Sequence, residues 1–563
     1  MQTEQKPVIY QLLPRLYTNR VSEPVFDGSI EQNGSGKLNY ITPPVIKAIK
    51  ELGTTHIWLT GVIEHAHCTD YSKYGIKPDN HHVVKGKAGS PYAIKDYYDI
   101  DPDLAEDVPN RMCEFEAVVK RIHDQGMKVV IDFVPNHVAR CYHSDVAPGN
   151  ARDLGADDDC TYGFKPSNNF IYITNQQFAP SIDLGSGVDK YVEFPAKASG
   201  NDCFTAFPGV NDWYETVKLN YGVDPWDHSQ HFHPIPDTWH KMLHILHYWA
   251  DKGVDAFRCD MAHMVPLDFW HWAIADVKAK HPQVQFIAEI YDVNLYRPFI
   301  HFGGFDYLYD KVNLYDTLRG IVGGHVSAAQ ITSCWQRIDG IGSHMLNFLE
   351  NHDEQRIASP EFAGNPQKAI PAMVVSAMIG TGAVMIYGGQ EFGERAAGAT
   401  GFSGDDGRTT IFDYCNIPTI QRWLGAAGRP ALTRLSVPQR QLRQQYQAIL
   451  DVCCKEPAVT CGQFYDLMYV NFHTSGFNPH SHYAFLRCHE NDLIIVVANF
   501  SDAESDVCVN IPEHAFEFLG LKPGNKQATD LLSGTSVDIT VSPDVLLSLV
   551  VPAYGAVVYK MQL

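Results

Sequence analysis

Eight short apolar segments, each ending in polar or charged residues, are the feature that most restricts how this chain can fold. In order they read PVIYQLLPRLY, THIWLTGVIE, KVVIDFVPNH, GVDAFRCD, QFIAEIY, FDYLYDK, MLNFLENHDE and AVMIYGGQE. Segments with the spacing of amphipathic helices lie between them, for example CEFEAVVKRIHDQG at 113–126. Alternating strands and helices favour a parallel sheet, and eight such units close a barrel. We therefore predict an α/β fold built on a (β/α)8 TIM barrel.

Two departures from this alternation predict further domains. More than a hundred residues separate KVVIDFVPNH from GVDAFRCD, and much of this stretch is rich in Gly, Asn, Asp and aromatic residues. We predict an inserted domain after the third strand, over 139–225. Strand-like alternation in HYAFLRCHENDLIIVVANFS and LLSLVVPAYGAVVYKM predicts a C-terminal antiparallel β-sandwich domain over 457–563. The barrel is then expected over 1–138 and 226–456.

Composition restricts the partners of the chain. The 44 basic and 65 acidic residues give a formal charge of −21, which disfavours nucleic acids and anionic membranes and favours a neutral substrate. No apolar run reaches the length of a membrane span. The 13 cysteines are odd in number and irregularly spaced, which favours free thiols in a reducing compartment. Together with an N-terminal segment that lacks a signal-peptide pattern, this predicts a cytoplasmic protein, or a periplasmic or secreted one if a signal was removed.

Polar residues follow four of the eight predicted strands. A single acid in such a place is commonly a helix cap or a surface ion pair. Several strands contributing together favour a catalytic site, because the carboxyl ends of all barrel strands meet at one face. The residues are Asp132, Asn136 and His137 on the third segment, Arg258, Asp260 and His263 on the fourth, Glu289 on the fifth, and Glu350, His352, Asp353 and Glu354 on the seventh.

Hydrolysis of a glycosidic bond with retention of anomeric configuration requires carboxyl groups of this kind. It requires an ionised carboxylate as nucleophile and a protonated carboxyl as general acid, roughly 5 Å apart. Arg258 lies two residues before Asp260, so both side chains point to the same side of the strand and the cation should keep Asp260 ionised. Glu289 in FIAEIY has apolar neighbours, so desolvation should keep it protonated. We expect Asp260 to be the nucleophile and Glu289 the acid.

Four of the segments carry a family resemblance. DFVPNH, GVDAFRCD, AEIY and FLENHD resemble, in order and spacing, the four signature regions of the α-amylase family, glycoside hydrolase family 13. The segment GSPYAIKDYYDIDP, the insertion after the third strand and the β domain at the end fit the same resemblance. It implies an enzyme that acts on an α-glucan through a glycosyl-enzyme intermediate.

The resemblance also implies a role for each matching residue. Asp260 matches the nucleophile, Glu289 the general acid/base, and Asp353 a third carboxylate that grips sugar hydroxyls. Only the resemblance selects Asp353 over Glu350 or Glu354. The expected substrate-binding residues are Arg258, which orients the nucleophile, His137 and His352, which hydrogen-bond the sugar, and Tyr92, which stacks on it, with Asp132 supporting the arginine.

The resemblance raises a question about metal and one about specificity. Asn136 resembles an asparagine that binds calcium in many family members, and GADDDC at 155–160 could add oxygen ligands, although a solvated acidic loop explains it equally well. No cofactor is expected for the chemistry itself. Met261, Ala262, His263 and Met264 stand where many starch-degrading members have a lysine–histidine pair that binds sugar beyond the cleaved bond. The polar segment at 401–414 is expected to line the groove.

These observations favour a retaining α-glycosidase that cleaves α-1,4 bonds of starch-like glucans or maltooligosaccharides by double displacement. Two alternatives stay open. The first is an α-glucanotransferase or sugar-isomerising member that uses the same intermediate. The second is a non-catalytic glucan-binding relative, which is less favoured because the three carboxylates Asp260, Glu289 and Asp353 are all present. The α-1,4 or α-1,6 preference, endo or exo action, chain length and oligomeric state do not follow from the sequence.

Overall fold

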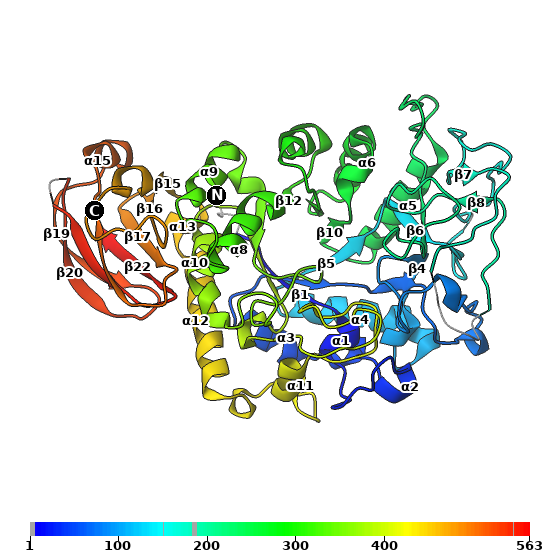
Figure 1. The fold of residues 1–563 in the computed structure, drawn as a ribbon, viewed down its shortest axis with the longest axis horizontal. Helices are drawn as coiled ribbons and strands as arrows, with labels where there is room; N and C mark the ends of the chain where they lie inside the picture. The colour runs from blue at the N-terminus through cyan, green and yellow to red at the C-terminus, as the bar shows by residue number, and fades with distance from the viewer. Residues whose placement is uncertain (1–5, 150, 183–188, 544) are drawn as a thin grey trace.

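A closed barrel of eight parallel strands forms the centre of the molecule (Figure 1). The computed structural model describes residues 6–149, 151–182, 189–543 and 545–563. In spatial order the strands are β1 (Val8–Leu12), β2 (His56–Leu59), β5 (Lys128–Phe133), β10 (Ala256–Cys259), β11 (Gln285–Ala288), β12 (Tyr307–Tyr309), β13 (Met345–Phe348) and β14 (Ala383–Tyr387), which pairs with β1. All eight predicted segments supply a barrel strand, so the predicted fold class is confirmed.

Side chains alternate between the barrel interior and the surrounding helices. In β10, Ala256 belongs to the interior cluster, whereas Phe257 and Cys259 pack in the larger outer core. The period of two therefore turns Arg258 and the following Asp260 inward. The outer layer includes α3 (Pro43–Lys50), α4 (Arg111–Asp124), α5 (Asp237–Asp251), α6 (Leu267–Lys280), α8 (Asp316–Val322), α9 (Gln330–Arg337), α10 (Ile370–Met378) and α12 (Val437–Lys455).

The chain leaves the barrel between β5 and β10 and builds the inserted domain at one end of the molecule (Figure 1). Two small antiparallel pairs organise the described part of it: β6 (His137–Ala139) with β9 (Thr216–Lys218), and β7 (Tyr172–Ile173) with β8 (Ala196–Lys197). Residues 150 and 183–188 of the predicted range 139–225 lie outside the described residues. The first inserted strand, β6, begins within the DFVPNH segment, which ties the insertion directly to the end of a barrel strand.

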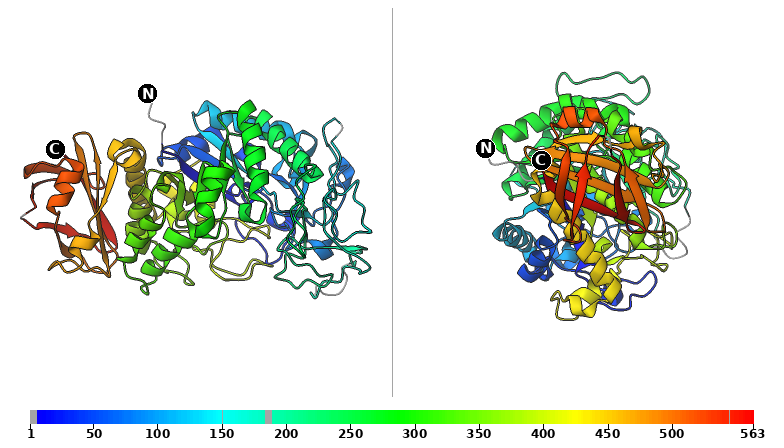
Figure 2. Two further views of the ribbon diagram at one scale, coloured as in Figure 1. Left: turned by 90° about the horizontal axis from the view of Figure 1, so that it is seen from above. Right: turned by 90° about the vertical axis from the view of Figure 1, so that its left-hand side faces the viewer.

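The C-terminal part is antiparallel, as predicted, and lies at the opposite end from the inserted domain (Figures 1 and 2). Its main sheet contains β15 (Gln463–Asp466), β16 (His482–His489), β17 (Asp492–Asn499), β22 (Gly555–Gln562), β19 (Gly524–Asp530) and β20 (Ser536–Val541), and β18 (Ser505–Val509) pairs with β21 (Leu547–Val551). The buried side chain of Arg487 in β16 donates to the carbonyl of Ile379, just after the fully buried helix α10. Within the described ranges, no helix combines the length and apolar character needed to cross a membrane.

Candidate active site

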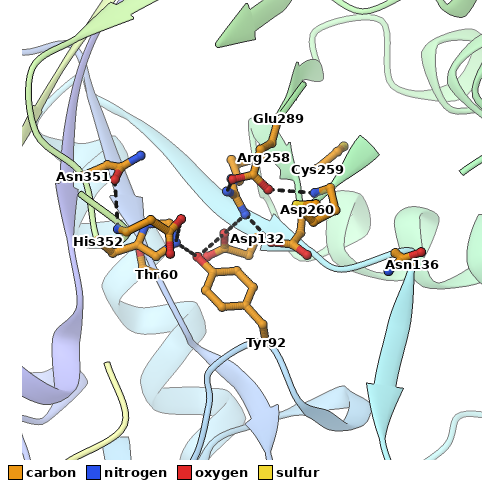
Figure 3. A network of polar contacts seen from close by, with 12 residues as sticks. Thr60, Tyr92, Asp132, Asn136, Arg258, Cys259, Asp260, Glu289, Asn351 and His352 are labelled. Carbon is orange, nitrogen blue, oxygen red and sulfur yellow. Dashed lines mark hydrogen bonds and ion pairs between the residues drawn. The ribbon is translucent and has the colours of Figure 1, made fainter. Parts of the chain in front are cut away.

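The predicted catalytic acids meet at the carboxyl ends of the barrel strands. Asp132 lies near the end of β5, Asp260 directly follows β10, and Glu289 directly follows β11. Figure 3 shows Asp132, Asp260 and Glu289 grouped around Arg258, with Asn136 set apart from them. The structure therefore brings residues from three neighbouring strands into one buried cluster.

Arg258 joins the two predicted catalytic carboxylates. Its side chain is inaccessible to solvent. Nη1 lies 2.7 Å from Oδ1 of Asp260, and Nη2 contacts Oε1 of Glu289. The Oδ1 atom of Asp132 lies 3.6 Å from Nη1. The guanidinium carbon also lies 5.4 Å from the ring centroids of three aromatic residues, a distance at which cation–π attraction contributes: Trp58, Tyr92 and Tyr309.

Burial changes the protonation of Asp260. Burial, and next the charge of Glu289, raise the pKa of Asp260 well above its ordinary value, although the contact with Arg258 acts to lower it. This net direction is opposite to the one expected from Arg258 alone, because the sequence pattern contains neither the depth of burial nor the proximity of Glu289. Asp260 therefore holds a proton to higher pH than an isolated carboxyl group would.

Two further donors fix Glu289. The backbone N–H of Met261 donates to Oε2 at 2.8 Å, and the hydroxyl of Tyr291 donates to Oε1 at 2.7 Å. Met261 has a φ of 44°, a left-handed backbone conformation that is uncommon for residues other than glycine. The N–H of Met261 contacts Glu289 in this conformation. The sequence analysis did not select Tyr291. Its position two residues after Glu289 in AEIY places both side chains on the same side of the strand end and could have indicated the contact.

Asp353 lies beside a network of aromatic and imidazole rings. Nε2 of His352 is 3.1 Å from Oδ2 of Asp353 and 2.5 Å from the hydroxyl of Tyr92. The rings of Tyr92 and His352 are stacked with centroids 5.1 Å apart, and Gln11, another residue that the sequence analysis did not select, lies 2.7 Å from Nδ1 of His352. Desolvation acts to raise the pKa of Asp353, but His352, Arg258 and Arg408 together outweigh it and lower the pKa to about 2. The side chain of Asp353 is 41% exposed, so an ionised carboxylate faces solvent.

The neighbouring acids of the seventh segment are engaged elsewhere. Glu350 is buried against Arg356, 2.8 Å away, and accepts the N–H of Ile357. Glu354 accepts the hydroxyl of Tyr315 at 2.9 Å. These contacts are typical of structural carboxylates.

His137 is the first residue of β6, and its ring contacts Asn136 and Trp213. Its Nδ1 is 3.1 Å from Nδ2 of Asn136, and its ring centroid is 5.2 Å from that of Trp213. Burial, helped by Lys218 and Lys85, lowers its pKa to about 3, so the ring is neutral. A hydrogen bond with the backbone of Tyr92 links it to the rest of the predicted site.

The residues around Asn136 do not fit a calcium ion. Oδ1 of Asn136 accepts from Nζ of Lys218 at 2.5 Å, and Nδ2 donates to the carbonyl of Gly200 at 2.7 Å. In the GADDDC segment, Asp158 accepts two backbone N–H groups and one hydroxyl, from Asn169, Phe170 and Tyr172. Asp157 pairs with Arg152, and Asp159 with Lys165. A cationic side chain thus lies where the metal was expected.

Two segments beyond the cluster extend the site. Nδ1 of His263 lies 3.5 Å from the carbonyl of Glu289, and His263 lines a groove of about 410 Å³ together with Phe204 of the inserted domain. The charge of Arg408, in the polar segment at 401–414, contributes to the lowered pKa of Asp353.

The fold and the site define a class of protein: a (β/α)8 barrel whose catalytic face carries an arginine-linked group of carboxylates. The sequence-family model of the α-amylase catalytic domain matches residues 18–152. Alpha-amylase MalA of Haloarcula japonica is 26% identical over 391 residues, which cover 69% of this chain and 44% of that protein. An α-1,4-glucan:maltose-1-phosphate maltosyltransferase of Pseudomonas aeruginosa is 40% identical over 215 residues, 35% of this chain and 32% of that protein. The matched part thus spans less than half the length of either relative.

Solved structures give the same fold. The maltogenic α-amylase AmyB of Thermotoga neapolitana aligns with a TM-score of 0.64 at 18% identity and covers 99% of both chains. The α-amylase of Geobacillus thermoleovorans aligns with a TM-score of 0.63 at 18% identity, over 100% of this chain and 99% of that one. With the four motif segments at the ends of barrel strands, the chain is similar to the α-amylase family of glycoside hydrolases, and the solved structures show that it shares their fold.

Proposed function

We propose that the protein is a retaining α-glycosidase that cleaves α-1,4-glucosidic bonds of starch-like glucans or maltooligosaccharides. One observation carries the proposal: Arg258 links the carboxyl groups of Asp260 and Glu289 at the ends of neighbouring barrel strands. Double displacement begins from a pair of carboxyl groups that share one proton, one ionised and one protonated.

The proposed reaction has two steps. In the first, a carboxylate oxygen of Asp260 attacks the anomeric carbon while Glu289 gives its proton to the departing glycosidic oxygen, leaving a glycosyl ester on Asp260. In the second, Glu289 takes a proton from water, the water oxygen bonds to the anomeric carbon, and the ester bond to Asp260 breaks. Asp353, ionised beside His352, holds sugar hydroxyls and stabilises positive charge on the ring.

The contacts of Glu289 set a condition on the first step. Both of its oxygens are engaged: Oε2 accepts the N–H of Met261, and Oε1 accepts the hydroxyl of Tyr291 and pairs with Arg258. An oxygen that carries the proton must face the leaving group instead of one of these donors. We infer that substrate binding releases one of these contacts. The N–H of Met261 is a candidate, because His263 and Met264 of the same MAHM segment line the groove.

A transferase is the second candidate function. Several of the curated relatives are named as maltosyltransferases, including the one from Pseudomonas aeruginosa. Hydrolysis and transfer share the glycosyl ester and differ only in whether water or another nucleophile reacts with it. The two functions are therefore separated by products and not by the identity of Asp260 or Glu289.

A product profile tests the proposal. Incubation with maltoheptaose, starch, pullulan or trehalose is expected to yield shorter maltooligosaccharides from the α-1,4-linked substrates. Products longer than the maltoheptaose supplied would favour transfer and count against simple hydrolysis. Asp260→Asn should reduce turnover on the order of 10⁴-fold. Unchanged turnover in that variant would contradict the assignment of the nucleophile.

A further inference from the structure

Lys218 forms a buried contact between the barrel and the inserted domain. It is the last residue of β9, its side chain is only 10% exposed, and its backbone lies opposite His137 of β6. Three oxygens surround the ammonium: Asn136 Oδ1 at 2.5 Å, Asp202 Oδ1 at 2.6 Å and the carbonyl of Met264 at 3.3 Å. An ammonium group has three N–H donors, so this environment can satisfy each of them.

The three oxygens come from separate parts of the chain. Asn136 follows the barrel strand β5, Asp202 belongs to the inserted domain, and Met264 lies four residues after Asp260. Asp202 has a left-handed φ of 61°, a conformation that aspartate tolerates better than most residues. One ammonium therefore ties together the third strand, the insertion and the segment that follows the predicted nucleophile.

A calcium ion does not fit alongside this lysine. Calcium takes six to eight oxygens, and the Oδ1 atom expected to bind it already accepts from Nζ. A divalent cation on the same oxygen would lie against the ammonium, and repulsion between them would not be screened at this depth.

We propose that the ammonium of Lys218 replaces a calcium ion at Asn136 and anchors the inserted domain to the barrel without a metal. The anchor joins the carboxyl end of β5 to the backbone of Met264. It therefore holds the MAHM segment, and with it the N–H of Met261 that contacts Glu289, through protein groups alone. This inference depends on contacts outside the acid pair and does not rest on the proposed reaction.

Thermal unfolding of the full chain tests the proposal. The Tm is expected to stay within about 1 °C in EDTA and in millimolar calcium, because a ligand raises Tm only if the folded state binds it. A calcium-dependent rise of several degrees that disappears in Asn136→Ala would overturn the proposal. A rise that persists in Asn136→Ala would place the ion elsewhere and leave Lys218 as the anchor.

A matched pair of lysine variants provides a second test of the anchoring role of Lys218. Lys218→Met keeps the aliphatic stem but leaves Asp202 and Asn136 without their donor, so Tm should fall by several degrees and calcium should not restore it. Lys197→Met is the control, because Lys197 pairs with Glu193 inside the same inserted domain without reaching the barrel. The decrease in Tm caused by Lys197→Met should be clearly smaller than that caused by Lys218→Met. Equal losses in the two variants would contradict an anchoring role for Lys218.

Discussion

At the scale of single residues, Tyr291 offers a direct test of how the acid is held. Its hydroxyl donates to Oε1 of Glu289 at 2.7 Å, so Tyr291→Phe removes one donor and keeps the ring. A neutral hydrogen bond contributes about 1 kcal/mol, which predicts a loss in kcat of roughly fivefold. The pH profile should shift as well, because the lost donor changes the environment of the acid. Tyr469→Phe, on the exposed surface of the C-terminal domain, is the control and should change neither value.

The pH dependence of activity follows from the raised pKa of Asp260. Burial and the charge of Glu289 raise this pKa above the usual range of carboxyl groups, near 4. The proposed nucleophile must be ionised, so activity is lost as pH falls through the raised pKa. We expect the acid limb of kcat/KM to lie above pH 4. An acid limb at the ordinary carboxyl pKa would contradict the raised pKa of Asp260.

Residues close together in the sequence were easier to predict than residues brought together by the fold. The relation of Arg258 to Asp260 follows from a spacing of two in one strand, and the structure confirms that they are in contact. The role of Lys218 did not follow, because it lies 82 residues from Asn136 and no local pattern joins them. The raised pKa of Asp260 was also not predicted, because burial is a property of the whole site.

At the scale of elements, the strands and their ends were predictable. Each barrel strand is an apolar run that stops where polar residues begin, and that change marks the catalytic face. The inserted domain was predictable in place but not in structure. Its strands are only two or three residues long, so they lack the alternation that identifies a strand.

The last barrel helix provides a prediction about stability. Ser436 caps α12: its hydroxyl accepts from the N–H of Gln439, and the Gln439 side chain accepts the N–H of Ser436 in return. Ser436→Ala should cost about 1 kcal/mol. Denaturant unfolding measures the loss, and Ser436→Thr, which preserves the cap, should lose less. Equal stability of the alanine variant and the original protein would show that the cap contributes nothing.

At the scale of the whole molecule, the C-terminal domain covers part of the barrel. All nine residues of α10 are buried, and Arg487 of the domain donates to the backbone after that helix. A chain that ends at residue 456 would expose this apolar surface. We expect it to aggregate, as measured by size-exclusion chromatography, whereas the full chain elutes as a defined species. A soluble truncated barrel with full activity would contradict a structural role for the domain.

The most direct test of the central claim is to identify the residue that carries the glycosyl ester. In Glu289→Gln, an α-maltosyl fluoride can still react, because fluoride leaves without acid assistance, while the second step lacks its base. Peptide mass spectrometry should then find a maltosyl group on Asp260 in the peptide that contains GVDAFRCDMAHM. Fluoride release with Asp260 unmodified, or the sugar on another residue, would contradict the account.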